Sequence, residues 1–146
     1  MNGGRQSVIE AILKANLPVL FASPWYLAKQ VPSINNTVYG EFQDTWQDFY
    51  SDDPEYGLSG VSPQQLKLIV GGEVCQWGEQ INGEAIWPLM WPRAAAAAER
   101  LWSPKSANNA SGAWIRFMQT SCRLQQRGFG ATPIRPDYCE HTWDFE

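Results

Sequence analysis

Two short segments place aromatic rings, a hydroxyl group and carboxylates directly after apolar runs. The first segment is Ser23-Pro24-Trp25-Tyr26-Leu27, which follows the apolar stretch 17–22. The second is Gly-Gly-Glu-Val-Cys-Gln-Trp-Gly-Glu at 71–79, which follows the apolar stretch 66–70. Indoles stack on the apolar face of a sugar ring, while a phenol and a carboxylate hydrogen-bond its polar groups. The candidate sugar-binding residues are Trp25, Tyr26, Trp77 and Glu79.

A second interpretation of these residues is structural. The chain contains eight tryptophans, and aromatic side chains commonly fill protein cores, so Trp25 and Trp77 are alternatively core residues. Glu73 is expected to orient a site residue or a loop rather than to bind ligand. Lys29 is expected in a solvated loop, and its alternative place is the pocket rim, where it would favour acidic substrates.

Short apolar runs that alternate with helical patterns predict parallel β/α architecture. Strands are expected over 17–22 and 66–70, and both runs are continuous, which is typical of strands buried on both faces. The expected helices are 6–16, single turns near 45–50 and 62–65, a long helix with Pro92 in its first turn, and 110–127 with Gly128 as its C-cap. Two strands do not make a stable parallel sheet. We therefore expect the chain to be part of a larger parallel β/α fold, and a TIM (β/α)8 barrel needs eight such strands.

The two segments carry a family resemblance. Together with Trp91-Pro92-Arg93, the alanine run 94–98 and Glu99-Arg100-Leu101-Trp102, they resemble the C-terminal part of the family 20 glycoside hydrolases, the β-N-acetylhexosaminidases. The resemblance covers nearly the whole chain, residues 1–146. It implies that the chain is the last two β/α units of a TIM (β/α)8 barrel plus the terminal helix, with strand seven at 19–23 and strand eight at 67–72. The N-terminal domain and strands 1–6 of the barrel would then be absent from this sequence.

The resemblance also implies a mechanism and a role for each candidate residue. The 2-acetamido carbonyl of the sugar acts as the nucleophile, so the enzyme needs none of its own. Trp25 and Trp77 would wall the acetamide pocket, and Tyr26 would donate its hydroxyl to the acetamide oxygen. Glu79 would accept hydrogen bonds from the sugar hydroxyls at positions 4 and 6. The parent enzyme would act on glycans that end in N-acetylglucosamine or N-acetylgalactosamine.

One departure from the family pattern bears on activity. The family's acid is the glutamate of an Asp-Glu pair after strand four, and this chain contains no Asp-Glu dipeptide. We therefore expect the isolated chain to be inactive. The alternatives are a non-catalytic remnant that binds a sugar or a partner, and a stand-alone domain whose tryptophans all lie in its core.

Further features concern the compartment and the partners. By resemblance, Cys122 and Cys139 form a disulfide, which leaves Cys75 unpaired, and the parent is a lysosomal or secreted glycoprotein that forms a homo- or heterodimer. Asn35 and Asn109 head N-glycosylation sequons. The first residues lack a signal-peptide pattern, and no apolar run is long enough to span a membrane. A net charge of −4 does not indicate nucleic-acid binding, and with one histidine neither a metal cluster nor a cofactor is expected.

Overall fold

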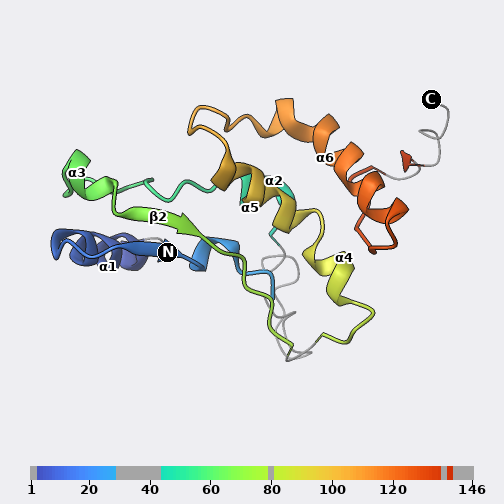
Figure 1. The fold of residues 1–146 in the computed structure, drawn as a ribbon, viewed down its shortest axis with the longest axis horizontal. Helices are drawn as coiled ribbons and strands as arrows, with labels where there is room; N and C mark the ends of the chain where they lie inside the picture. The colour runs from blue at the N-terminus through green and yellow to red at the C-terminus, as the bar shows by residue number, and fades with distance from the viewer. Residues whose placement is uncertain (1–2, 29–43, 79–80, 136–137, 140–146) are drawn as a thin grey trace.

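The computed structural model describes residues 3–28, 44–78, 81–135 and 138–139 (Figure 1). Helices and strands alternate along the chain, as predicted. In chain order the elements are α1 (Gly3–Lys14), β1 (Val19–Phe21), the 3-10 helix η1 (Ser23–Trp25), α2 (Trp46–Ser51), α3 (Pro63–Leu66), β2 (Ile69–Gly72), α4 (Ile86–Met90), α5 (Arg93–Trp102) and α6 (Ala110–Gln126).

The two predicted strands are parallel neighbours. Val19 pairs with Ile69 and Phe21 pairs with Gly72, with an irregularity in the register between them. β2 starts later than predicted, because residues 63–66 form the helical turn α3, which Ser62 caps through the backbone N–H of Gln65. This parallel pair is compatible with two adjacent units of a β/α barrel.

The prediction that both strands are buried on both faces is wrong for this structure. Val19 and Phe21 are buried, but Leu20 between them is 54% exposed and Val70 on β2 is 63% exposed. Side chains alternate between the two faces of a strand. The face of the sheet that carries Val19 and Phe21 therefore packs on the core, whereas Leu20 and Val70 stay largely exposed among the described residues.

The core lies between the covered sheet face and the helices. The alanine run packs closely, with Ala94, Ala96 and Ala97 all buried. These small side chains let α5 pack against α2, and α6 packs against both helices (Figure 1). Phe117 of α6 joins the aromatic residues of α2, with ring centroids 4.6 Å from Trp46 and 5.5 Å from Tyr50.

An irregular segment, residues 52–60, anchors α1. Arg5 forms an ion pair with Asp52 at 3.3 Å. The Glu10 carboxylate accepts hydrogen bonds from the backbone N–H groups of Ser59 (3.0 Å) and Gly60 (3.3 Å). These bonds lower the pKa of Glu10, because they stabilise its charged form. The first helix is therefore held in place by residues about fifty positions further along the chain.

The helix around Pro92 differs from the prediction. The sequence predicts one long helix, whereas the structure has the short helix α4, a cis Trp91–Pro92 peptide bond and then α5. Pro92 precedes α5 as its N-cap residue, so it does not lie within the first turn. α4 escaped prediction because its five residues include Pro88 and are too few for a helical period.

The C-terminal helix is close to its prediction. α6 ends at Gln126, and Gly128 follows with a positive φ of 83°. The N–H of Gly128 donates to the carbonyl of Gln125, and that of Phe129 donates to Leu124, which is the Schellman pattern of a helix end.

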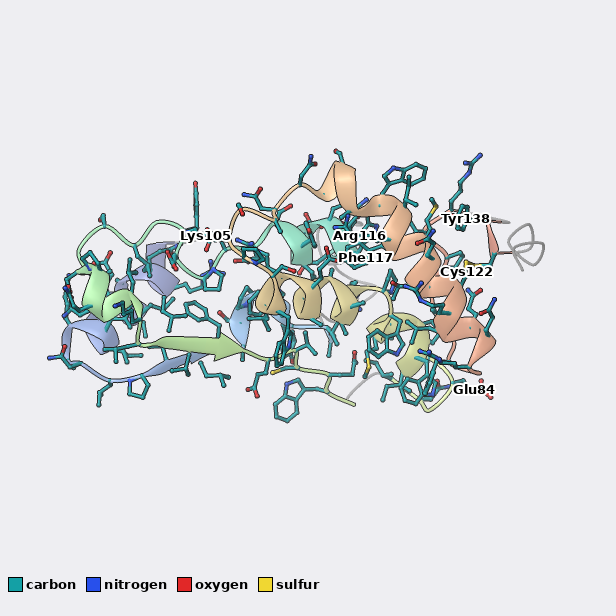
Figure 2. All side chains as sticks on the ribbon, turned by 45° about the horizontal axis from the view of Figure 1, so that its top comes forward. Glu84, Lys105, Arg116, Phe117, Cys122 and Tyr138 are labelled. Atoms are coloured by element: carbon teal, nitrogen blue, oxygen red, sulfur yellow. A yellow bond between two sulfur atoms is a disulfide. The ribbon has the colours of Figure 1, made fainter. Side chains whose placement is uncertain are left out.

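The predicted disulfide is confirmed. Cys122 of α6 is bonded to Cys139, with their Cα atoms 5.3 Å apart, and Figure 2 shows Cys122 beside the segment that carries Tyr138. Cys75 is a free cysteine, as predicted. The sequon residue Asn109 is exposed at the start of α6, whereas Asn35 lies outside the described residues.

Candidate functional site

The first candidate segment turns directly from β1 into the core. Trp25 is 0% exposed, and its indole N–H donates to the backbone carbonyl of Phe49 at 2.9 Å. A side chain with no exposed surface has no face to offer a ligand. Trp25 is therefore a core residue in this structure, which corrects the expectation that its ring forms a wall of the sugar pocket.

The end of β2 is shaped to receive the Trp25 ring. A Cβ atom at Gly72 would lie 2.2 Å from Cζ3 of Trp25 and 3.0 Å from the carbonyl oxygen of Phe21. Carbon atoms in contact are about 3.5–4.0 Å apart, so only glycine fits at this position. Gly72 thus lets the ring of Trp25 pack directly against the backbone of β2.

Backbone hydrogen bonds join the two candidate segments beyond the strand ends. The N–H of Cys75 donates to the carbonyl of Trp25 at 3.1 Å, and the N–H of Leu27 donates to Cys75 at 2.8 Å. Tyr26 and Cys75 form an isolated parallel bridge. The sequence-based expectation that the two segments meet at the ends of adjacent parallel strands is confirmed for their backbones.

Two of the candidate side chains remain accessible. Tyr26 is half-buried, and Trp77 is 56% exposed. Paired residues of neighbouring strands point to the same face, and so do residues two apart in an extended chain. We therefore expect Tyr26 and Trp77 to share one face. Glu79 and Lys29 lie outside the described residues, while Glu73 is exposed and its N–H donates to the carbonyl of Phe21 at 2.7 Å.

Arg93 hydrogen-bonds to the backbone of the segment that carries Tyr26, a contact that sequence reasoning did not predict. Its Nη2 donates to the carbonyl of Leu27 and its Nε donates to Leu89, both at 3.0 Å. The guanidinium also lies over the Phe49 ring, 5.5 Å from its centroid. Burial lowers the pKa of Arg93, and the charge of Asp44 opposes this shift. The only sequence signal was an arginine at the start of the alanine helix.

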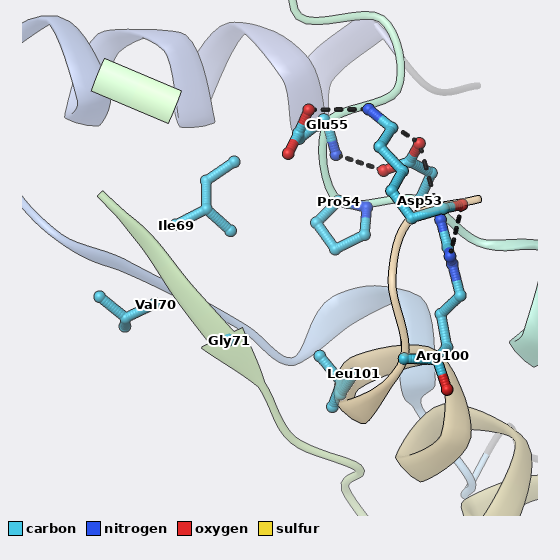
Figure 3. A pocket seen from close by; sticks show the side chains of 10 residues that line it. Asp53, Pro54, Glu55, Ile69, Val70, Gly71, Arg100 and Leu101 are labelled. Atoms are coloured by element: carbon cyan, nitrogen blue, oxygen red, sulfur yellow. Dashed lines mark hydrogen bonds and ion pairs between the residues drawn. The ribbon is translucent and has the colours of Figure 1, made fainter. Parts of the chain in front are cut away.

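A hollow of about 240 Å³ lies elsewhere, beside the start of β2 (Figure 3). Arg100 donates to the carbonyl of Lys105 at 3.1 Å and lies 3.8 Å from the Asp53 carboxylate. Lys105 pairs with Glu55 at 2.7 Å, and this hydrogen bond raises the pKa of Lys105. The charges of the hollow are thus paired with one another, and Gly71 is the one described residue of the two candidate segments that lines it. Its lining residues are Asp53, Pro54, Glu55, Ile69, Val70, Gly71, Arg100, Leu101, Ser103 and Lys105.

Two further features of the described residues bear on function. Within the described part of the chain, no group of three or more His, Cys, Asp or Glu side chains is arranged to hold a metal ion. None of the described helices is both long and apolar enough to cross a membrane.

The fold and the paired strand ends define a class, namely proteins built from parallel β/α units. The model of the glycosyl hydrolase family 20 catalytic domain matches residues 2–105 of the chain. The chain therefore belongs to glycoside hydrolase family 20, whose catalytic domains are TIM barrels.

Individual relatives point the same way. The chain is 42% identical over 134 residues to the beta-hexosaminidase subunit A1 of Dictyostelium discoideum, covering 91% of this chain and 24% of that protein. It is 38% identical to the alpha subunit of Rattus norvegicus over 136 residues, which are 93% of this chain and 24% of the subunit. The chain is 35% identical to the beta-hexosaminidase subunit beta of Felis catus over 135 residues, which are 92% of this chain and 23% of the subunit. The chain spans about a quarter of the length of these relatives.

Proposed function

We propose that this chain forms the strand-seven and strand-eight part of the sugar pocket of a β-N-acetylhexosaminidase. The complete enzyme would remove terminal non-reducing N-acetylhexosamine residues from glycoconjugates with retention of anomeric configuration. The observation that carries the proposal is the backbone pairing of Tyr26 with Cys75, two residues before the exposed Trp77. This pairing supports the proposal, because it brings the backbones of the two segments together and β/α barrels bind their substrates at the C-terminal ends of their strands.

Each residue has a defined part in the proposed reaction. The acetamide oxygen of the sugar attacks the anomeric carbon, and the glycosidic oxygen leaves with a proton from an acid. Tyr26 donates its hydroxyl to the acetamide oxygen and holds it in line for this attack. Trp77 covers the acetamide methyl group, and Glu79 accepts hydrogen bonds from the distal hydroxyls. Trp25 acts from the core, since its buried ring fixes the backbone on either side of it.

The proposal includes a limit on what these 146 residues do alone. They contain no Asp-Glu pair to supply the acid and to orient the acetamide nitrogen. A general acid contributes about 10²- to 10⁴-fold to such a reaction. We expect the purified chain to give no turnover of an aryl N-acetylglucosaminide, and measurable turnover would refute this part of the proposal.

A fluorescence titration tests the pocket directly. N-acetylglucosamine added to the chain should change the emission of Trp77, because the sugar displaces water from an exposed indole. The response should vanish in Trp77→Phe and persist in Trp102→Phe, a matched control because Trp102 is 92% exposed and lies at the end of α5. An unchanged spectrum, or an equal response in Trp77→Phe, would refute sugar binding at this segment.

Kinetics in a complete catalytic domain that includes this chain test the roles of the residues. Tyr26→Phe should lower kcat far more than it changes KM, because its hydrogen bond strengthens as the acetamide oxygen attacks. Glu79→Gln should affect both constants, because the hydroxyls it holds are present throughout the reaction. Equal effects of the two substitutions on KM alone would contradict these assignments.

A second candidate function rests on the missing Asp-Glu pair. In it, the chain is a non-catalytic remnant that binds a sugar or a partner through the same segments. Determining the complete transcript separates the two candidates, because an upstream Asp-Glu pair favours the enzyme. For the first candidate function we further propose that the complete enzyme is a lysosomal or secreted homo- or heterodimer. It would act on glycans that end in N-acetylglucosamine or N-acetylgalactosamine.

A further inference from the structure

We infer that Asn109 has two roles at once: its side-chain carbonyl caps α6, and its amide nitrogen is the attachment point of an N-linked glycan. The two roles use different atoms of one side chain. Oδ1 accepts a hydrogen bond from the backbone N–H of Gly112 at 3.1 Å, which is an N-cap contact. Glycosylation bonds a sugar to Nδ2 and leaves Oδ1 as an acceptor, so the cap and the glycan are compatible.

The surroundings of the amide nitrogen are open. Asn109 is exposed, and so is Ser111, whose hydroxyl completes the Asn109-Ala110-Ser111 sequon. Gly112 does not crowd this nitrogen, since even a Cβ atom there would lie 3.4 Å from Nδ2, which is an ordinary van der Waals contact.

The disulfide points independently to the compartment in which such a glycan is added. Bonds such as Cys122–Cys139 form and persist in oxidising compartments, including the lumen of the endoplasmic reticulum. A glycosyltransferase acts there with a lipid-linked diphosphate oligosaccharide as donor. Nδ2 forms a bond to the anomeric carbon of the oligosaccharide and loses one proton. The bond from that carbon to the diphosphate breaks, and the lipid diphosphate leaves.

The experiment expresses the full chain behind an added secretion signal in eukaryotic cells, in an Asn35→Gln background so that only one sequon remains. Treatment with an amide-cleaving glycosidase should shift the mass of the parent and of the Asn108→Gln control. It should not shift Ser111→Ala or Asn109→Asp. The mass shift is measured on protein from the lumen of the endoplasmic reticulum as well as on protein from the medium, so the result does not depend on export. A lumenal, disulfide-bonded parent without glycan, or a glycan that persists in Ser111→Ala, would overturn the inference.

Thermal melting separates the cap from the glycan. Ser111→Ala keeps the asparagine cap, and Asn109→Asp keeps a capping oxygen, so both should melt within about 1 °C of the deglycosylated parent. Asn109→Ala removes the cap as well and should melt about 4 °C lower. If Asn109→Ala melts with the other two variants, the side chain has no capping role and the dual assignment fails.

Discussion

Gly72→Ala tests how the Trp25 segment is held against β2. The new methyl group would lie 2.2 Å from Cζ3 of Trp25, so relief of the clash requires a shift of at least about 1.3 Å, given contact distances of about 3.5 Å. The indole is enclosed by the core, and its N–H is bonded to the carbonyl of Phe49. The ring therefore cannot move without losing packing or this hydrogen bond.

The expected loss of stability combines two terms. Overpacking a filled core costs about 1–3 kcal/mol, and breaking the indole hydrogen bond adds about 1 kcal/mol. We therefore expect Gly72→Ala to reduce the free energy of unfolding by about 3 kcal/mol. Gly83→Ala is the matched control, because a Cβ atom at Gly83 would meet nothing within 4 Å, and it should change stability by less than about 0.5 kcal/mol.

A double-mutant cycle with Trp25→Phe identifies the cause. Phenylalanine lacks the outer ring that meets the new methyl group, so Gly72→Ala should cost only about 1 kcal/mol in that background, a coupling energy of about 2 kcal/mol. Urea denaturation followed by circular dichroism measures all four proteins. Additive effects would show that the clash with Trp25 is not the reason for the glycine, and the reasoning would fail.

Three further predictions concern charges and the disulfide. Glu10→Gln should destabilise the protein at neutral pH but not well below pH 4. The lowered pKa of Glu10 gives stability that is present above the unfolded-state pKa and is lost as the pH falls. Melting curves over a range of pH check this, and a difference between parent and variant that does not change with pH would contradict it. Cys139→Ser should reduce the free energy of unfolding by about 3 kcal/mol, because it opens the 17-residue loop that the disulfide with Cys122 closes. A reductant should reduce the free energy of unfolding of the parent by the same amount and leave that of the variant unchanged. Burial and the hydrogen bond to Glu99 raise the pKa of Tyr50, so stability should fall above about pH 10, and Tyr50→Phe should flatten that alkaline decline.

The helix ends and strand positions were predictable where the signal is local. Thr45 and Ser62 each cap a short helix through the N–H three residues on, and Gly128 ends α6 with the positive φ that glycine adopts readily. Such contacts lie within a few residues along the chain. The parallel pairing also followed from the sequence, because apolar runs alternate with helical patterns.

The burial of individual side chains was not predictable in the same way. Trp25 and Trp77 both lie beyond apolar runs of the sequence, yet one is enclosed and the other is exposed. The difference depends on Phe49 and Gly72, which lie 24 and 47 positions from Trp25 along the chain. Arg93 was missed for the same reason, since its partner carbonyl at Leu27 is 66 residues away.

The anchoring of α1 by residues 52–60 has a consequence for synthesis. Its polar partners lie 47 to 50 residues downstream of Arg5 and Glu10. Ribosomes add about 5–20 residues per second, so α1 waits about 3 to 10 s before these partners are made. During that interval these polar partners of Arg5 and Glu10 are not yet available to α1. Slower translation between residues 15 and 60 would lengthen the interval in which α1 lacks them.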